Sequence, residues 1–287
     1  MSEVRSFIKK YKKHKSGMIG VTLILICLLS AVLANFLAPA DPIQQNLANK
    51  FIPPLFSEGG RWPHILGTDV LGRDLFSRIL YGARLSFFIG LLAVLVGGGV
   101  GIPLGMVAGY FGKRTDTIIM RFIDVLLAFP SLLLAVCIVA MLGPSLENAV
   151  IAIGIVTIPT YARIARSSVL SEKNKEYVLA DISIGKGHFS ILFKSIFPNI
   201  IGPILVIGTL MFGEAVLGAA GLSFLGLGAQ PPSPEWGALI DEGKKYIFQA
   251  WWLVVFPGLA ILATVIGFNL MGDALQDLLD PKKSRSK

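Results

Sequence analysis

Residues 85–112 read LSFFIGLLAVLVGGGVGIPLGMVAGYFG, a stretch without a single charged side chain. A helix needs roughly 20 mostly apolar residues to cross a bilayer, because lipid offers the backbone no hydrogen-bond partner. Similar uncharged runs occupy residues 16–40, 125–146, 215–234 and 246–272, and a shorter one covers residues 148–162. The sequence therefore predicts an all-α membrane protein with six transmembrane helices. Their expected limits are 17–38, 85–111, 118–142, 145–165, 198–226 and 251–272.

The composition excludes an ordinary soluble domain. The 287 residues are 54% hydrophobic and only 15% charged, with a mean hydropathy of +0.70. Soluble domains carry about 25% charged residues. Both cysteines, Cys27 and Cys137, lie inside apolar runs, so a disulfide scaffold is excluded and they are interpreted as small hydrophobic residues.

Charge asymmetry predicts the orientation of the chain, since loops rich in Lys and Arg stay on the cytoplasmic side. Most of the 26 Lys and Arg residues fall in segments that are inside if the N-terminus is inside. We therefore expect a cytoplasmic basic N-terminus (1–16), an external loop (39–84) and a cytoplasmic tail (280–287). The same asymmetry accounts for the formal net charge of +8, so no nucleic-acid partner is predicted. The first apolar run is longer than a signal-peptide core and is interpreted as an anchor.

The inside loop of residues 166–197 is the one loop with helical patterning. In EYVLADISIG (176–185), the apolar residues Tyr177, Ala180 and Ile184 recur at steps of three and four, which predicts a short amphipathic helix that ends at the glycines 185 and 187. A second helix is expected over 188–197, with Pro198 in the first turn of the fifth span. The pattern alone leaves two interpretations open, a partner-docking surface or a helix lying in the lipid interface.

Charged residues near or within the spans are candidates for function. Glu214 interrupts the fifth span, which suits either a translocation path or gate, or a buried hydrogen bond between helices. Arg121 and Asp124 are expected to form an intrahelical pair near the third span. In the external loop, the spacing of Asp69, Arg73 and Asp74 allows local ion pairs. This external loop is predicted to form a structural cap or a docking surface for an external partner.

Four motifs together give the chain a specific resemblance to a known family. They are HILGTDVLGRD (64–74), the loop 176–199, GLSFLGLGAQPPSPEWG (221–237) and GDALQDLLDP (272–281). The chain resembles the permease subunits of bacterial ATP-binding-cassette (ABC) importers, specifically the second permease of dipeptide and oligopeptide uptake systems. This resemblance implies the type I ABC importer permease fold, with its core over residues 85–279.

Within the loop, the resemblance aligns residues with the EAA signature of that family. Leu179, Ala180 and Asp181 occupy the three signature places, where Asp181 stands in place of a small residue. The resemblance implies that Gly185 is the signature glycine and that Ile196 and Pro198 belong to the closing element. It further implies that this loop is a coupling helix that inserts into a groove of a cytoplasmic ATPase, with Glu176 and Tyr177 at its start.

The resemblance also implies the partners. They are a sibling permease, two ABC ATPase subunits, an extracytoplasmic substrate-binding protein and the lipid of the bacterial cytoplasmic (inner) membrane. This chain would catalyse no reaction and bind no cofactor or metal, while ATP and Mg²⁺ would be used by the ATPase subunits. The expected substrates are di- or oligopeptides. A nickel or metal-chelate importer is the alternative within the family, and an ion-coupled secondary transporter or channel is the alternative from another class.

Overall fold

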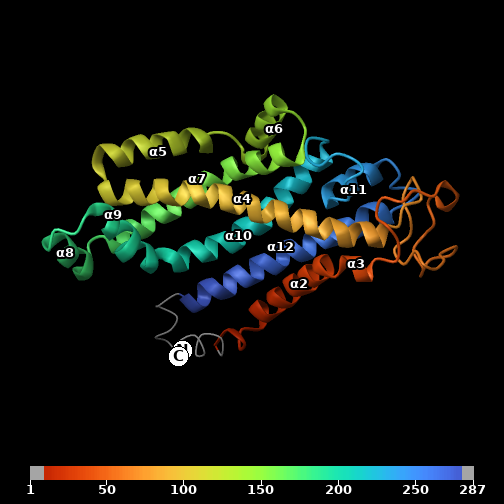
Figure 1. Ribbon diagram of the computed structural model, residues 1–287, viewed down its shortest axis with the longest axis horizontal. Coiled ribbons are helices and arrows are strands. Elements are labelled where there is room, and N and C mark those ends of the chain that lie inside the picture. Colours follow the sequence, from red (N-terminus) through yellow and green to blue (C-terminus); the bar gives the residue numbers. More distant parts are fainter. Residues whose placement is uncertain (1–9, 280–287) are drawn as a thin grey trace.

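A computed structural model describes residues 10–279, and helices make up most of this range. Five helices run side by side along the longest axis of the molecule (Figure 1). Each is long and apolar enough to cross a membrane. These five are α2 (Lys15–Val32), α4 (Leu75–Phe111), α7 (Leu146–Glu172), α10 (Phe197–Phe224) and α12 (Trp252–Leu279).

The sixth pass is broken rather than straight. The expected continuous span over 118–142 is wrong: α5 (Lys113–Leu127) and α6 (Ser131–Leu142) meet at an angle of 86°. Pro130 lies at this bend and explains the break, because proline lacks an N–H and also disfavours helical backbone in the residue before it. Since α4 and α7 both run toward the same end of the molecule, the α5–α6 pair returns the chain to the other end (Figure 1). The all-α prediction is therefore confirmed, and the described residues make six passes if the bent pair counts as one.

The long helices extend beyond several of the predicted limits. Helix α4 begins at Leu75 rather than at residue 85. Residues 75–84, which were predicted as the last part of the external loop 39–84, therefore belong to this helix. Asp74 caps its start, accepting a hydrogen bond from the Ser77 N–H at 2.8 Å. Arg78 in the first turns is buried in ion pairs, so its charge does not prevent helix formation there. Likewise, α7 continues to Glu172 and α12 to Leu279.

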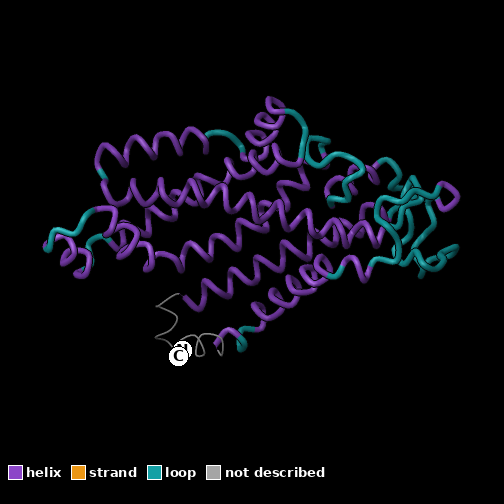
Figure 2. The backbone as a smooth tube through the Cα atoms, in the orientation of Figure 1, coloured by secondary structure: helices purple, strands orange, loops and turns teal. Residues whose placement is uncertain are grey.

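Shorter elements gather at the two ends of the bundle, where the connecting loops lie (Figure 2). One end carries the segment 38–74 and α11, which we call the cap, and the opposite end carries α8 and α9 (Figure 1). These elements are α3 (Ala34–Leu37), the 3₁₀-helix η1 (Leu47–Asn49), α8 (Glu176–Ser183), α9 (His188–Ser190), the π-helix η2 (Ile191–Ile196) and α11 (Trp236–Lys244).

The described ends of the chain lie beside each other. His14 Nε2, at the start of α2, is 3.4 Å from Asp277 Oδ2 near the end of α12. This arrangement agrees with an even number of passes. The predicted tail 280–287 and most of the predicted basic N-terminus 1–16 lie outside the described residues.

The bundle is held by close packing of small residues. In α4, a Cβ added at Gly101 would lie 2.5 Å from the backbone oxygen of Ile158 in α7, so only glycine allows this approach. In α2, a Cβ at Gly20 would lie 2.7 Å from the backbone oxygen of Gly267 in α12. In lipid there is no hydrophobic driving force between helices, so close packing of this kind contributes to helix association.

Candidate functional site

Helix α8 projects from the bundle and presents apolar side chains to its surroundings. Only Val178 is buried, in a cluster with Val169 of α7 and Ile196 of η2. The predicted amphipathic helix is confirmed, but the residue that anchors it is Val178, outside the pattern from which the helix was predicted. The exposed large apolar side chains on and just after α8 are Tyr177, Leu179, Ile182, Ile184, Phe189 and Phe193, with Ile184 78% and Phe189 75% exposed.

The Asp181 side chain links α8 to residues that follow it in the loop. Its Oδ2 accepts hydrogen bonds from Lys186 Nζ at 2.7 Å and from Ser195 Oγ at 2.5 Å, and Lys186 Nζ also donates to Ser195 Oγ at 2.7 Å. These contacts, that of Lys186 first, lower the pKa of the Asp181 carboxyl, so it is ionised at neutral pH. The side chain that departs from the family signature therefore joins α8 to the segment that leads into α10.

A sharp turn and then an unbroken helix follow α8. Gly185 adopts φ +78°, which ends α8 in a backbone conformation that favours glycine. The expected separate helix over 188–197 is instead continuous with the long helix, which runs from His188 to Phe224. Its segment Ile191–Ile196 is a π-helix, and the Phe197 N–H donates to the Leu192 carbonyl. Pro198 next to this segment lacks a donor N–H, which explains the local widening.

Polar contacts fasten this end of the molecule to α4 and α7. Tyr110 Oη and His188 Nδ1 are 2.9 Å apart, and Lys173 Nζ donates to the Gly109 carbonyl at 3.0 Å. Asp124 pairs with Arg163 of α7 at 2.7 Å. The expected Arg121–Asp124 pair is therefore wrong, because the carboxylate turns toward a cation on the neighbouring helix. The contacts of Tyr110 and Lys173 therefore hold the base of the loop against α4.

Glu214 lies in an open groove of about 340 Å³ between α6, α7 and α10. The bend before α6 tips that helix away from the α5 axis. The wall includes Ser131 and Thr157, while the rest is apolar or glycine. Glu214 is exposed to this groove, and within the described residues it forms no hydrogen bond to another helix of this chain.

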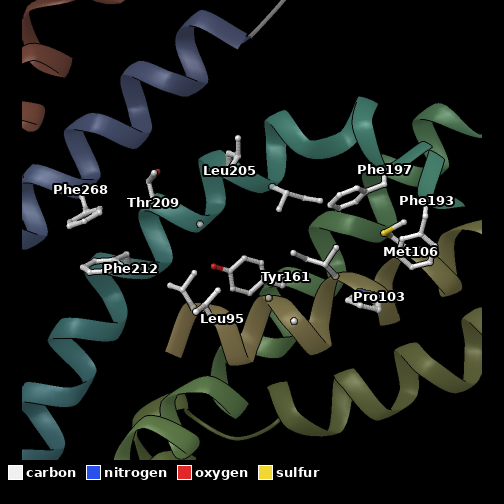
Figure 3. A pocket seen from close by; sticks show the side chains of 16 residues that line it. Leu95, Pro103, Met106, Tyr161, Phe193, Phe197, Leu205, Thr209, Phe212 and Phe268 are labelled. Carbon is white, nitrogen blue, oxygen red and sulfur yellow. The ribbon is translucent and has the colours of Figure 1, made fainter. Parts of the chain in front are cut away.

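A second cavity, of about 500 Å³, lies between α4, α7, α10 and α12 and is lined almost entirely by apolar side chains. Figure 3 shows Tyr161 pointing between the helices that carry Leu95 and Thr209. Its hydroxyl is buried and has no hydrogen-bond partner within the described part of the chain. The lining of this cavity includes no charged residue, whereas the groove between α6, α7 and α10 is lined by Glu214.

The cap contains a cluster of four charged side chains, of which three are buried and Glu242 is partly exposed. Arg73 donates to Asp69 at 2.6 Å and to Glu242 of α11 at 2.6 Å. Arg78 donates to the same two carboxylates at 2.6 and 2.7 Å. The predicted local pair of Asp69 and Arg73 is confirmed, whereas Asp74 pairs with His64 at 2.9 Å. Glu242 was not predicted, because no local pattern links it to residues so far away in the sequence.

The arrangement of the helices has a counterpart among solved structures. A chain of the inward-facing MetNI methionine ABC transporter superposes with a TM-score of 0.57 at 15% identity, covering 71% of this chain and 97% of that one. The likeness establishes the type I ABC permease fold for a multi-pass membrane chain.

Family matches then identify the chain. Residues 101–285 match the family described as binding-protein-dependent transport system inner membrane component. Residues 2–54 match the N-terminal TM domain of oligopeptide transport permease C. The chain therefore belongs to the family of binding-protein-dependent transport system inner membrane components, and it is a permease of the bacterial inner membrane.

Relatives cover nearly the full chain. It is 47% identical to the di/tripeptide transport system permease protein DppC of Pseudomonas aeruginosa, over 98% of this chain and 93% of that protein. It is 47% identical to the dipeptide transport system permease protein DppC of Escherichia coli K12, over 98% and 94%. The corresponding protein of Haemophilus influenzae is 45% identical, over 95% and 92%.

Proposed function

We propose that this chain is one of two permease subunits of an ATP-driven importer of di- or oligopeptides. The relatives named as dipeptide permeases support the peptide substrate. The partners would be a sibling permease, two ABC ATPase subunits and an extracytoplasmic substrate-binding protein. This chain would bind no cofactor, and the ATPase subunits would use ATP and Mg²⁺.

The observation that carries the proposal is helix α8, which exposes apolar side chains at the end of the molecule opposite the cap. Exposed apolar surface of this kind is typical of a contact with a protein or a membrane surface, and the family resemblance of the loop favours a protein. We place α8 on the cytoplasmic side, where the excess of Lys and Arg is predicted to lie. There, Glu176, Tyr177, Leu179 and Ala180 would contact the ATPase.

The contacts around α8 supply a mechanical link to the membrane. Asp181 joins α8 to Ser195, and Ser195 lies in the continuous helix from His188 to Phe224 that also carries Glu214. Movement of the ATPase would displace α8, and this helix would transmit the displacement into the bundle. The groove beside Glu214 would then alternate between outward and inward access, a two-state change biased by ATP.

The test is ATP-dependent dipeptide uptake by the complete assembly in liposomes. Ala180 is exposed on α8, so Ala180→Trp leaves the chain folded but is expected to abolish uptake by blocking the fit to the ATPase. Thr117→Trp places the same bulk at an exposed position of α5 and is expected to retain uptake. Undiminished uptake by Ala180→Trp, at equal amounts of chain, would contradict the coupling role of α8.

A further inference from the structure

Glu214 is a carboxylate at membrane depth. Helix α10 rises 1.5 Å per residue, so Glu214 lies about 15 Å from its end at Phe224 and about 25 Å from its start at Phe197. In the described range 10–279, its carboxylate forms no hydrogen bond or ion pair with another side chain. An ionised group in a bilayer is costly unless a cation or water meets it. The carboxylate is therefore free to meet water or a cation from outside this chain.

The groove around Glu214 has the size and shape of a small-ligand site. Its volume is about 340 Å³, within the range of about 300–1,000 Å³ for pockets that hold small molecules. Gly218 and Gly221 on α10 form part of its wall. A Cβ at either position would lie 3.8 Å or more from its nearest neighbour, so the absent side chains leave the groove open.

We propose that Glu214 binds the α-ammonium group of the transported peptide as it passes along this groove. The inference rests on the proposed function and adds a contact that fixes the orientation of the peptide. An unmodified peptide carries this cation whatever its side chains, since its α-amino pKa is about 8. The ammonium group supplies three donors, while the apolar walls between α6, α7 and α10 tolerate varied side chains. One carboxylate thus recognises the feature that all such substrates share.

The experiment measures dipeptide uptake per ATP hydrolysed, with the binding protein, sibling permease and ATPases reconstituted together in liposomes. Glu214→Gln keeps the shape of the side chain and removes its charge. We expect uptake per ATP to fall about tenfold or more, the loss expected for one hydrogen bond to a charged group. Glu214→Asp should restore most of it. Glu147→Gln makes the same chemical change at an exposed position outside the groove and should leave the ratio unchanged.

Each other outcome overturns the inference. An unchanged ratio in Glu214→Gln means that the peptide does not use this carboxylate. If uptake and ATP hydrolysis fall in the same proportion, Glu214 acts in gating or pairs with a cation of the sibling permease. If the wild-type assembly takes up no dipeptide, the proposed function itself fails. The wild-type measurement therefore separates that failure from the loss of a single contact in Glu214→Gln.

Discussion

Replacing Glu242 by Gln should destabilise the cap strongly. Two guanidinium groups, of Arg73 and Arg78, share two carboxylates at 2.6–2.7 Å, and both arginines are about 2% exposed or less. Without Glu242, two buried cations would face the single carboxylate of Asp69. Breaking a buried pair costs about 3–5 kcal/mol. Because the Glu242 side chain is 18% exposed, water offsets part of this loss, and we expect about 3 kcal/mol.

The assay is thermal unfolding of the purified assembly, followed by tryptophan fluorescence. Asp241→Asn is the matched control, because Asp241 pairs with Lys244 at a partly exposed position; such pairs contribute about 0–1 kcal/mol. The double variant with Arg78→Met and Glu242→Gln removes one charge of each sign. It should lose less stability than the sum of the two single variants. A loss for Glu242→Gln no larger than that for Asp241→Asn would show that the cap does not depend on this ion-pair cluster.

Two further predictions concern packing and the loop. Gly20→Ala would place a methyl group 2.7 Å from the backbone oxygen of Gly267 and should lower the free energy of unfolding by about 1–3 kcal/mol. Gly99→Ala has open space around the added methyl group and should leave the stability unchanged. Equal unfolding temperatures for the two variants would contradict this prediction. Asp181→Ala removes the acceptor shared by Lys186 and Ser195, so amide exchange in α8 should become faster and uptake should fall. Unchanged exchange would show that the packing of Val178 alone holds α8.

Hydropathy predicted the long helices because each contains a long, mostly apolar run, but it could not find features that depend on distant partners. Helix α4 begins before its uncharged run because Arg78 is neutralised by Glu242, and Arg84 donates to the Ala31 carbonyl at 2.6 Å. The bend at Pro130 lies within an uncharged run, so hydropathy gives no signal for it.

The candidate site was predictable to a similar degree. The pattern of Tyr177, Ala180 and Ile184 located α8, because apolar residues at steps of three and four fall on one face of a helix. The role of Asp181 was not predictable, because its partner Ser195 belongs to the next helix. Glu214 was identified as an acid inside a span, but the groove around it depends on the tilt of α6.

The most direct measurement is purification of the tagged chain in mild detergent, with mass spectrometry of the proteins that remain bound. We expect the wild-type chain to retain a sibling permease and ABC ATPase subunits. We expect Ala180→Trp to retain the sibling and lose the ATPase, because α8 is proposed to make that contact. Recovery of a homo-oligomer without an ATPase, or equal recovery of the ATPase by both chains, would contradict the assignment of α8 as the coupling element.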